Sequence, residues 1–197
     1  NAPAVISRGF HPTSLFGAFG AAAGVGVLYG FDPATIGCAW GHALSLTGGS
    51  MQFSDEPAGT TVKRLHAGYG AQHGLLAASM AKAGIAAPAR SLDGKYGLFA
   101  LYGSTTNAEL LKRPGSVPLQ IHDISMKPYS CCRLFHSLID ALEEASDAFS
   151  LAPDDVERIR VRAPAVVFDQ HMLRRPRSVM AAQYSLPYVV GATLAYG

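Results

Sequence analysis

Residues 13–30 read TSLFGAFGAAAGVGVLYG, an apolar stretch in which glycine and alanine separate the larger side chains. A hydroxyl at Thr13 or Ser14 can cap the free amides of a helix that begins there, and Gly30 is a typical end for it. Glycine interrupts the stretch too often for a membrane span, which needs about 20 continuous apolar residues. We therefore expect a closely packed helix in a folded, mainly helical domain.

The residues up to about 113 continue this helical texture. A second helix is predicted over 33–47, because Asp32-Pro33 combines a capping side chain with a residue that suits the first helical position. A third helix is predicted over 67–83, with short helical turns over 96–102 and 107–112. The apolar spacing of the third helix predicts one core-facing stripe, made of Leu75, Leu76, Ser79 and Met80.

The second part of the chain has a different pattern. Alternating side chains predict a strand over 120–126, and alternating apolar and basic residues predict another over 159–163. An amphipathic helix is predicted over 133–149 and a final helix over 181–196. The expected core face of the amphipathic helix carries Leu134, Leu138, Ile139, Leu142 and Ala145.

This change of texture places a domain boundary near 114–119. The predicted fold class is mainly α with a smaller α/β part, arranged as a helical domain over 1–116 and an α/β domain over 117–197. Because the chain starts with Asn rather than Met and stops at Gly197 in an apolar stretch, we expect a fragment of a longer protein.

The composition argues against several classes of protein. Of the 197 residues, 49% are hydrophobic and 15% are charged, which suits a sizeable buried core. A formal net charge of +2 with scattered Lys and Arg argues against nucleic acid, and no segment predicts a membrane partner or a signal peptide. The three cysteines form neither a CxxC motif nor a zinc pattern. We therefore expect a cytoplasmic protein and predict no metal site.

Two clusters in the helical part combine a cation with an imidazole. In RGFHPT (8–13), Arg8 and His11 precede a helix N-terminus, where backbone amides and the helix dipole favour an anion. In TTVKRLHAG (60–68), Lys63 and His66 are three residues apart and would share one side of a helical turn. Each cluster can also be an ordinary capped helix start with a locally satisfied histidine.

Two further clusters lie in the second part. In KPYSCCRLFH (127–136), Lys127 ends a predicted strand, and Arg133 and His136 share a first helical turn. In AQYSLPY (182–188), a tyrosine hydroxyl can exchange a proton if its pKa is lowered. The alternatives are a core histidine, cysteines that only fill space, and tyrosines that only pack. Together the four clusters predict a small anionic substrate that carries carboxylates.

The same segments resemble, in the same order, the MmgE/PrpD family, which includes 2-methylcitrate dehydratase and cis-aconitate decarboxylase. The resemblance covers nearly the whole chain. The matching segments are RGFHPT (8–13), GAFGAA (17–22), KRLHAG (63–68), KPYSCCRLFH (127–136), IDA (139–141) and AQYSLPY (182–188).

The resemblance implies an all-helical domain, a smaller α/β lid domain and an active site in the cleft between them. It also implies a homodimer that needs no metal or organic cofactor, and a parent protein considerably longer than this chain. By motif position, the residues expected around the substrate are His11, Lys63, Lys127 and Tyr188 as catalytic groups, with His66 and His136 as substrate-binding groups. The local clusters add Arg8 and Arg133 as further substrate-binding candidates.

The predicted reaction is that of a lyase on a polycarboxylate, with dehydration of 2-methylcitrate as the leading candidate. Lys63 and Lys127 would bind carboxylates and stabilise developing charge, while His11 and Tyr188 carry the proton. Decarboxylation of cis-aconitate and epimerisation of an amino- or imino-dicarboxylate could use the same groups. The rivals are an inactive truncated remnant and a carboxylate-binding protein without turnover.

Overall fold

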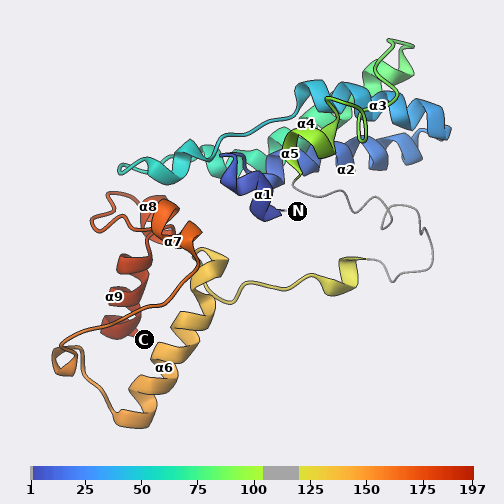
Figure 1. Cartoon of the computed structure of the whole chain (residues 1–197). Helices are drawn as coiled ribbons and strands as arrows, with labels where there is room; N and C mark the ends of the chain where they lie inside the picture. Colours follow the sequence, from blue (N-terminus) through green and yellow to red (C-terminus); the bar gives the residue numbers. More distant parts are fainter. Residues whose placement is uncertain (1, 104–119) are drawn as a thin grey trace. The chain divides into compact units, whose positions relative to one another are not determined.

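The computed structural model describes residues 2–103 and 120–197. The chain divides into two compact units, Asn1–Met51 with Val62–Val117 and Gln52–Thr61 with Pro118–Gly197, called here the first and second unit (Figure 1). The segment Gln52–Thr61 therefore belongs to the second unit, although the chain on both sides of it belongs to the first. The predicted boundary at 116/117 and the predicted turn over 107–112 lie outside the described residues.

The described part of the first unit is helical. A 3-10 helix, Met51–Asp55, starts at Met51 of the first unit and continues into the Gln52–Thr61 segment of the second unit. Helices α2, α3 and α4 pack against one another in Figure 1. The α-helices in the described part of the first unit are α1 (Ala2–Ser7), α2 (Pro12–Leu28), α3 (Pro33–Leu46), α4 (Val62–Lys82) and α5 (Leu98–Tyr102).

The starts of α2 and α3 follow two different capping arrangements. The prediction for α3 is confirmed, because the Thr35 amide donates to the Asp32 carboxylate at 2.7 Å and Pro33 begins the helix. The predicted cap of α2 is wrong, since His11 occupies the capping position without a side-chain hydrogen bond to the helix. Pro12 then opens α2, as the fixed φ of proline favours at a first helical position. The imidazole of His11 instead contacts His66, with 2.8 Å between the two Nδ1 atoms.

Helices α2 and α4 approach at their glycines. A Cβ on Gly70 would lie 3.2 Å from the Gly17 Cα, and a Cβ on Gly74 would lie 2.4 Å from the Ala21 Cβ. The predicted stripe on α4 is wrong, because Leu75 and Leu76 are 49% and 46% exposed. Small residues let the two backbones touch, and large side chains are therefore excluded from the buried face. The buried positions of α4 are His66, Gly70, Gly74, Ala77, Ala78 and Ala81.

The two strands predicted for the second unit are wrong. Residues 120–126 begin with a 3-10 helix, Gln120–Asp123, and residues 159–163 have no regular secondary structure. Within residues 2–103 and 120–197 the one β-type pairing is an isolated bridge between Phe10 and Ser50 of the first unit. The alternation over 159–163 instead reflects an irregular segment whose Val161 and Ala163 pack against the core.

Helices also build the described part of the second unit, so the mainly α fold class is confirmed. The amphipathic helix is present as α6 (His136–Phe149) after a 3-10 turn, Arg133–Phe135. Its Ile139, Leu138 and Leu142 belong to the core, whereas Leu134 is 47% exposed. The remaining elements are a 3-10 turn at Pro153–Asp155, α7 (Ala165–Gln170), α8 (Val179–Gln183) and α9 (Leu186–Tyr196).

The predicted final helix is in fact two helices. The chain breaks between α8 and α9, and the Ser185 hydroxyl caps α9 by accepting from the Tyr188 amide at 3.1 Å. The core of the second unit forms where α6 packs against α9 (Figure 1). At this break the carbonyl of Gln183 accepts from the Cys132 amide, and the carbonyl of Tyr184 lies against the imidazole of His171.

Candidate functional site

Two imidazoles meet in the first unit. The Nδ1 atoms of His11 and His66 lie 2.8 Å apart, within hydrogen-bond distance, and the ring planes are tilted by 44°. His11 stands at the start of α2, and His66 lies in the second turn of α4 and is 3% exposed. Residues 55 positions apart in the chain therefore form one titratable unit.

A short backbone clamp holds this pair. The His11 amide donates to the Gly49 carbonyl at 2.8 Å, and the Met51 amide donates to the Gly9 carbonyl at 2.8 Å. Gly49 has a φ of +112°, a conformation that other residues rarely adopt. A Cβ there would lie 2.7 Å from the Ser14 Cβ and 3.6 Å from the Cε1 of His66. The glycine is therefore required both for the backbone shape and for the space beside His66.

The surroundings of the pair favour uncharged imidazoles. Burial, then the neighbouring His66, then Lys63 lower the pKa of His11 from 6.5 to about 4. Burial, then Lys63, lower the pKa of His66 as well. Lys63 precedes His66 by one turn of α4, as the sequence spacing predicted. Both rings are therefore neutral near pH 7, next to a lysine.

The contact between two neutral rings fixes what their outer nitrogens can do. One Nδ1 must carry the hydrogen and the other must accept it. In the ring with hydrogen on Nδ1, the Nε2 atom has no hydrogen and can act as a base. In the partner ring the hydrogen is on Nε2, and this N–H can act as an acid. The pair therefore offers one proton acceptor and one proton donor at once. These roles are exchanged when the donor ring loses its Nε2 hydrogen, the Nδ1 hydrogen moves to it from its partner, and the partner gains a proton at Nε2.

Arg8 contacts the backbone of α5. Its guanidinium is exposed and donates to the carbonyl of Leu101 in α5. The first unit thus gathers three of its four candidates, His11, His66 and Lys63, into one cluster. The fourth, Arg8, is engaged by a backbone carbonyl.

The four candidates of the second unit lie in separate environments. The ammonium of Lys127 donates to the Cys131 carbonyl at 3.2 Å, and Arg133 is exposed at the first turn before α6. His136 is 1% exposed and meets the ring of Tyr129 edge-on, and neither of its ring nitrogens has a hydrogen-bond partner among the described residues. Tyr188 is 49% exposed at the start of α9.

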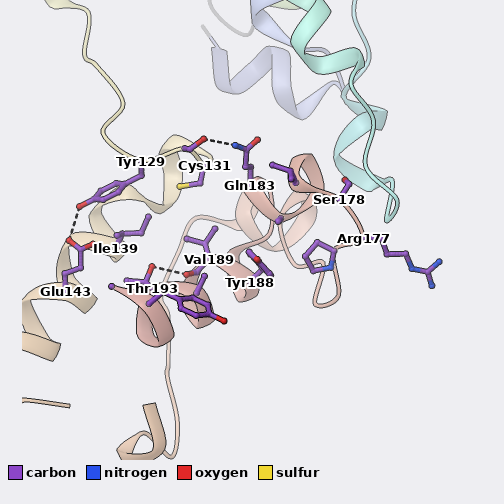
Figure 2. Close-up of a pocket in the computed structure, with 17 residues that line it drawn as sticks. Tyr129, Cys131, Ile139, Glu143, Arg177, Ser178, Gln183, Tyr188, Val189 and Thr193 are labelled. Atoms are coloured by element: carbon purple, nitrogen blue, oxygen red, sulfur yellow. Dashed lines mark hydrogen bonds between the residues drawn. The ribbon is translucent and has the colours of Figure 1, made fainter. Parts of the chain in front are cut away.

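A groove of about 670 Å³ in the second unit contains Tyr188 in its lining (Figure 2). Its polar groups include Glu143 and Gln183. The Glu143 carboxylate accepts from the Tyr129 hydroxyl at 3.2 Å, and the Gln183 amide donates to the Ser130 hydroxyl at 2.7 Å. The hydrogen bond from Tyr129 to Asp140, at 2.6 Å, is the largest of several effects that raise the pKa of Tyr129. Tyr129 is thus held as a neutral donor.

Sequence reasoning missed two features of this unit. Arg177 lines the groove, although the run of arginines around Pro176 resembles an ordinary solvated loop. His171, which has no motif around it, is 2% exposed with Nε2 3.8 Å from the Cys132 sulfur. The doubled cysteine at 131–132 was the one sequence signal near this contact.

Among residues 2–103 and 120–197, no group of three or more His, Cys, Asp or Glu side chains is placed to hold a metal ion. Over the same residues, none of the helices combines the length and the apolar character that a bilayer crossing needs.

The fold and these contacts define a mainly helical protein in two units, with a neutral imidazole pair beside a lysine. The chain belongs to the MmgE/PrpD family. The MmgE/PrpD N-terminal domain matches residues 1–111, and the MmgE/PrpD C-terminal domain matches residues 129–197.

Curated relatives of this chain are named cis-aconitate decarboxylases, which are lyases. The human enzyme is 29% identical over 198 residues, and that of Aspergillus terreus is 26% identical over 209 residues. The cis-aconitate decarboxylase-like protein oryM of Aspergillus oryzae is 28% identical over 208 residues. These matches cover 98%, 96% and 98% of this chain but 40%, 41% and 42% of the relatives. The chain therefore spans about two fifths of their length.

Proposed function

We propose that the chain carries the proton-transfer groups of a lyase that decarboxylates cis-aconitate. The observation that carries this proposal is the neutral His11–His66 pair beside Lys63. The names of the relatives favour decarboxylation over the dehydration of 2-methylcitrate, which the sequence alone ranked first.

The first step of the proposal is capture of the anion. Lys63 supplies a positive charge, and the first-turn amides at the start of α2, next to His11, favour a negative group. A carboxylate held there would lie close to the imidazole pair. Its charge would oppose the effect of Lys63 and make protonation of the pair easier than in the unliganded protein.

The second step is protonation of carbon as carbon dioxide leaves. The bond to the departing carboxylate breaks, and its electron pair spreads into the adjacent double bond and a neighbouring carboxylate. The Nε2 hydrogen of one imidazole is donated to carbon, while Lys63 stabilises the developing charge. That ring then takes the Nδ1 hydrogen of its partner, and the partner gains a proton from water. Both rings end neutral, with their roles exchanged.

Dehydration of 2-methylcitrate is the second candidate, because the same pair also presents a bare nitrogen that can remove a proton beside a carboxylate. Epimerisation of an amino- or imino-dicarboxylate would begin in the same way. Lys127 and Tyr188 remain proposed contributors to turnover, and a homodimer remains a prediction that sedimentation analysis can check.

The test is turnover by the purified chain of cis-aconitate, 2-methylcitrate and citrate, followed by carbon dioxide release and by absorbance of unsaturated products. Replacing His66 with Gln should lower kcat by about 10²–10⁴-fold, the usual worth of a positioned acid or base. His122→Gln, on an exposed residue, is the matched control and should leave kcat unchanged. Equal kcat in His66→Gln and His122→Gln would refute the assigned role of the pair.

Lys63→Gln separates charge from proton transfer. It should raise KM for the tricarboxylate and also move the acidic limb of the pH–rate profile upward, because Lys63 lowers the pKa of both histidines. Arg64→Gln, on the exposed neighbour, should do neither. Saturable binding without turnover of any substrate would favour the carboxylate-binding alternative, and neither binding nor turnover would favour the inactive one.

A further inference from the structure

We propose that Cys132 is a reactive thiol with His171 as its base, which makes it a modification site for small electrophiles. The Cys132 sulfur lies 3.8 Å from the Nε2 of His171, within the range for a hydrogen bond that involves sulfur. The imidazole is 2% exposed, whereas Cys132 is partly exposed. The sulfur thus faces a buried base, although its own residue is only partly buried. The inference does not depend on the proposed function.

The second ring nitrogen determines the direction of proton transfer. The Nδ1 of His171 lies 3.1 Å from the carbonyl of Tyr184. A carbonyl only accepts hydrogen bonds, so Nδ1 carries the hydrogen. In the neutral ring Nε2 is then bare and can accept the thiol proton from Cys132. A nucleophile, a base and a group that orients the base are therefore arranged in series, as nucleophilic activation requires.

The same break between α8 and α9 holds both partners. The Cys132 amide donates to the Gln183 carbonyl at 2.9 Å, and the carbonyl of His171 accepts from the Leu186 amide at 2.8 Å. The imidazole also contacts the rings of Phe135 and Tyr184, at centroid distances of 5.2 Å and 4.8 Å. The backbone and ring contacts restrict both side chains, so the pair is ready before an electrophile arrives.

The other two cysteines provide an internal comparison. The Cys131 sulfur is directed to the Cys132 carbonyl at 3.7 Å, and the Cys38 sulfur is directed to the Ile85 carbonyl at 3.2 Å. A backbone carbonyl can accept a hydrogen bond but is far too weak a base to remove a thiol proton. Burial, followed by the neighbouring Cys132, also raises the pKa of Cys131. The three thiols are therefore expected to differ in rate.

The reaction with iodoacetamide illustrates the proposed step. The Cys132 sulfur attacks the CH₂ carbon, a carbon–sulfur bond forms, and the carbon–iodine bond breaks with release of iodide. The thiol proton passes to Nε2 of His171 and from there to solvent. No oxidant or reductant is needed, and the product is a carbamidomethyl thioether.

The experiment treats the whole chain with limiting iodoacetamide at pH 7 and measures the labelling rate of each cysteine by peptide mass spectrometry. We expect Cys132 to react at least about tenfold faster than Cys131 and Cys38, since a positioned base contributes about 10²–10⁴-fold. His171→Gln should reduce the rate at Cys132 at least about tenfold and leave Cys38 unchanged. His122→Gln should leave all three rates unchanged.

Two outcomes would overturn the proposal. One is a rate at Cys132 in the unsubstituted chain that is no higher than at its neighbour Cys131. The other is an unchanged rate at Cys132 in a folded His171→Gln chain. If that variant does not fold, the comparison of Cys132 with Cys131 and Cys38 in the unsubstituted chain decides alone.

Discussion

The two units reach a buried core by opposite routes. Among the described residues, six of the ten members of the main buried cluster in the first unit are alanine, and the helices of this unit meet at glycines. In the described part of the second unit, the six buried residues of the corresponding cluster, which include Phe135 and Leu186, are all larger than alanine. The first unit achieves a tightly packed core through close approach of its helix backbones, and the second unit achieves it through large side chains.

This difference explains why the sequence predicts the buried face of some helices correctly and not of others. On α6 the large apolar residues do face the core, so their spacing reports the buried side. On α4 the buried face carries Gly70 and Gly74 while Leu75 and Leu76 face outward. Hydrophobic periodicity therefore identifies the buried face of a helix when large side chains fill the core. It identifies the wrong face when the helix packs through glycine and alanine.

The largest expected effect is a cavity in the second unit. Phe135 is fully buried, so Phe135→Ala should lower the free energy of unfolding by about 3–5 kcal/mol. Its neighbour Leu134 is 47% exposed, and Leu134→Ala should cost far less. Urea unfolding of both variants, with hydrogen exchange of α6 as the local readout, measures the difference. Similar losses in the two variants would contradict the assigned core.

The next effect is overpacking in the first unit. The added methyl group of Gly74→Ala would meet Ala21 at 2.4 Å and the Ala18 carbonyl at 2.6 Å, which should destabilise by about 1–3 kcal/mol. The same substitution at Gly68 meets nothing within 4 Å and should stabilise by about 0.5–1 kcal/mol. Unfolding followed by fluorescence of Trp40, the single tryptophan, reports this unit. Stabilisation by Gly74→Ala would exclude the close helix contact.

The sequence predicted most helices because their ends carry local signals. Asp32-Pro33 begins α3 and Gly84, with a φ of +76°, follows the end of α4, as expected. The predicted strands failed because strand pairing requires a partner, which a local pattern cannot report. The split of the final helix was missed because the capping role of Ser185 depends on a side-chain contact to the backbone.

In the candidate site, too, local sequence predicted some features and tertiary packing determined the others. The spacing of Lys63 and His66 placed them on one helix side, and the motif at the start of α2 selected His11. That His11 and His66 touch follows only from the packing of α2 on α4 and the clamp at Gly49. The contact of Cys132 with His171 likewise depends on tertiary structure, so no spacing rule could predict it.

A third prediction concerns pH and the first unit. The folded pKa values of His11 and His66 lie below the ordinary 6.5, so the unfolded chain binds protons first as the pH falls. The contribution of His11 is therefore complete above about pH 6.5 and is lost progressively as the pH falls toward about 4, and that of His66 is lost in the same direction. Trp40 fluorescence should show a smaller loss of stability between pH 7.5 and pH 4.5 in His11→Gln than in the unsubstituted chain. An equal loss would show that the pair does not control this dependence.

The smallest expected effect tests the buried face of α4 most directly. Leu76 is 46% exposed, so Leu76→Ala should change the free energy of unfolding by no more than about 0.5 kcal/mol, as at an ordinary surface site. Had the apolar spacing reported the core, removing this side chain would cost about 2–5 kcal/mol. The same Trp40 measurement distinguishes the two values clearly. A loss of several kcal/mol would mean that large side chains, rather than glycine contacts, hold α4 in place, and the contrast between the two units would then disappear.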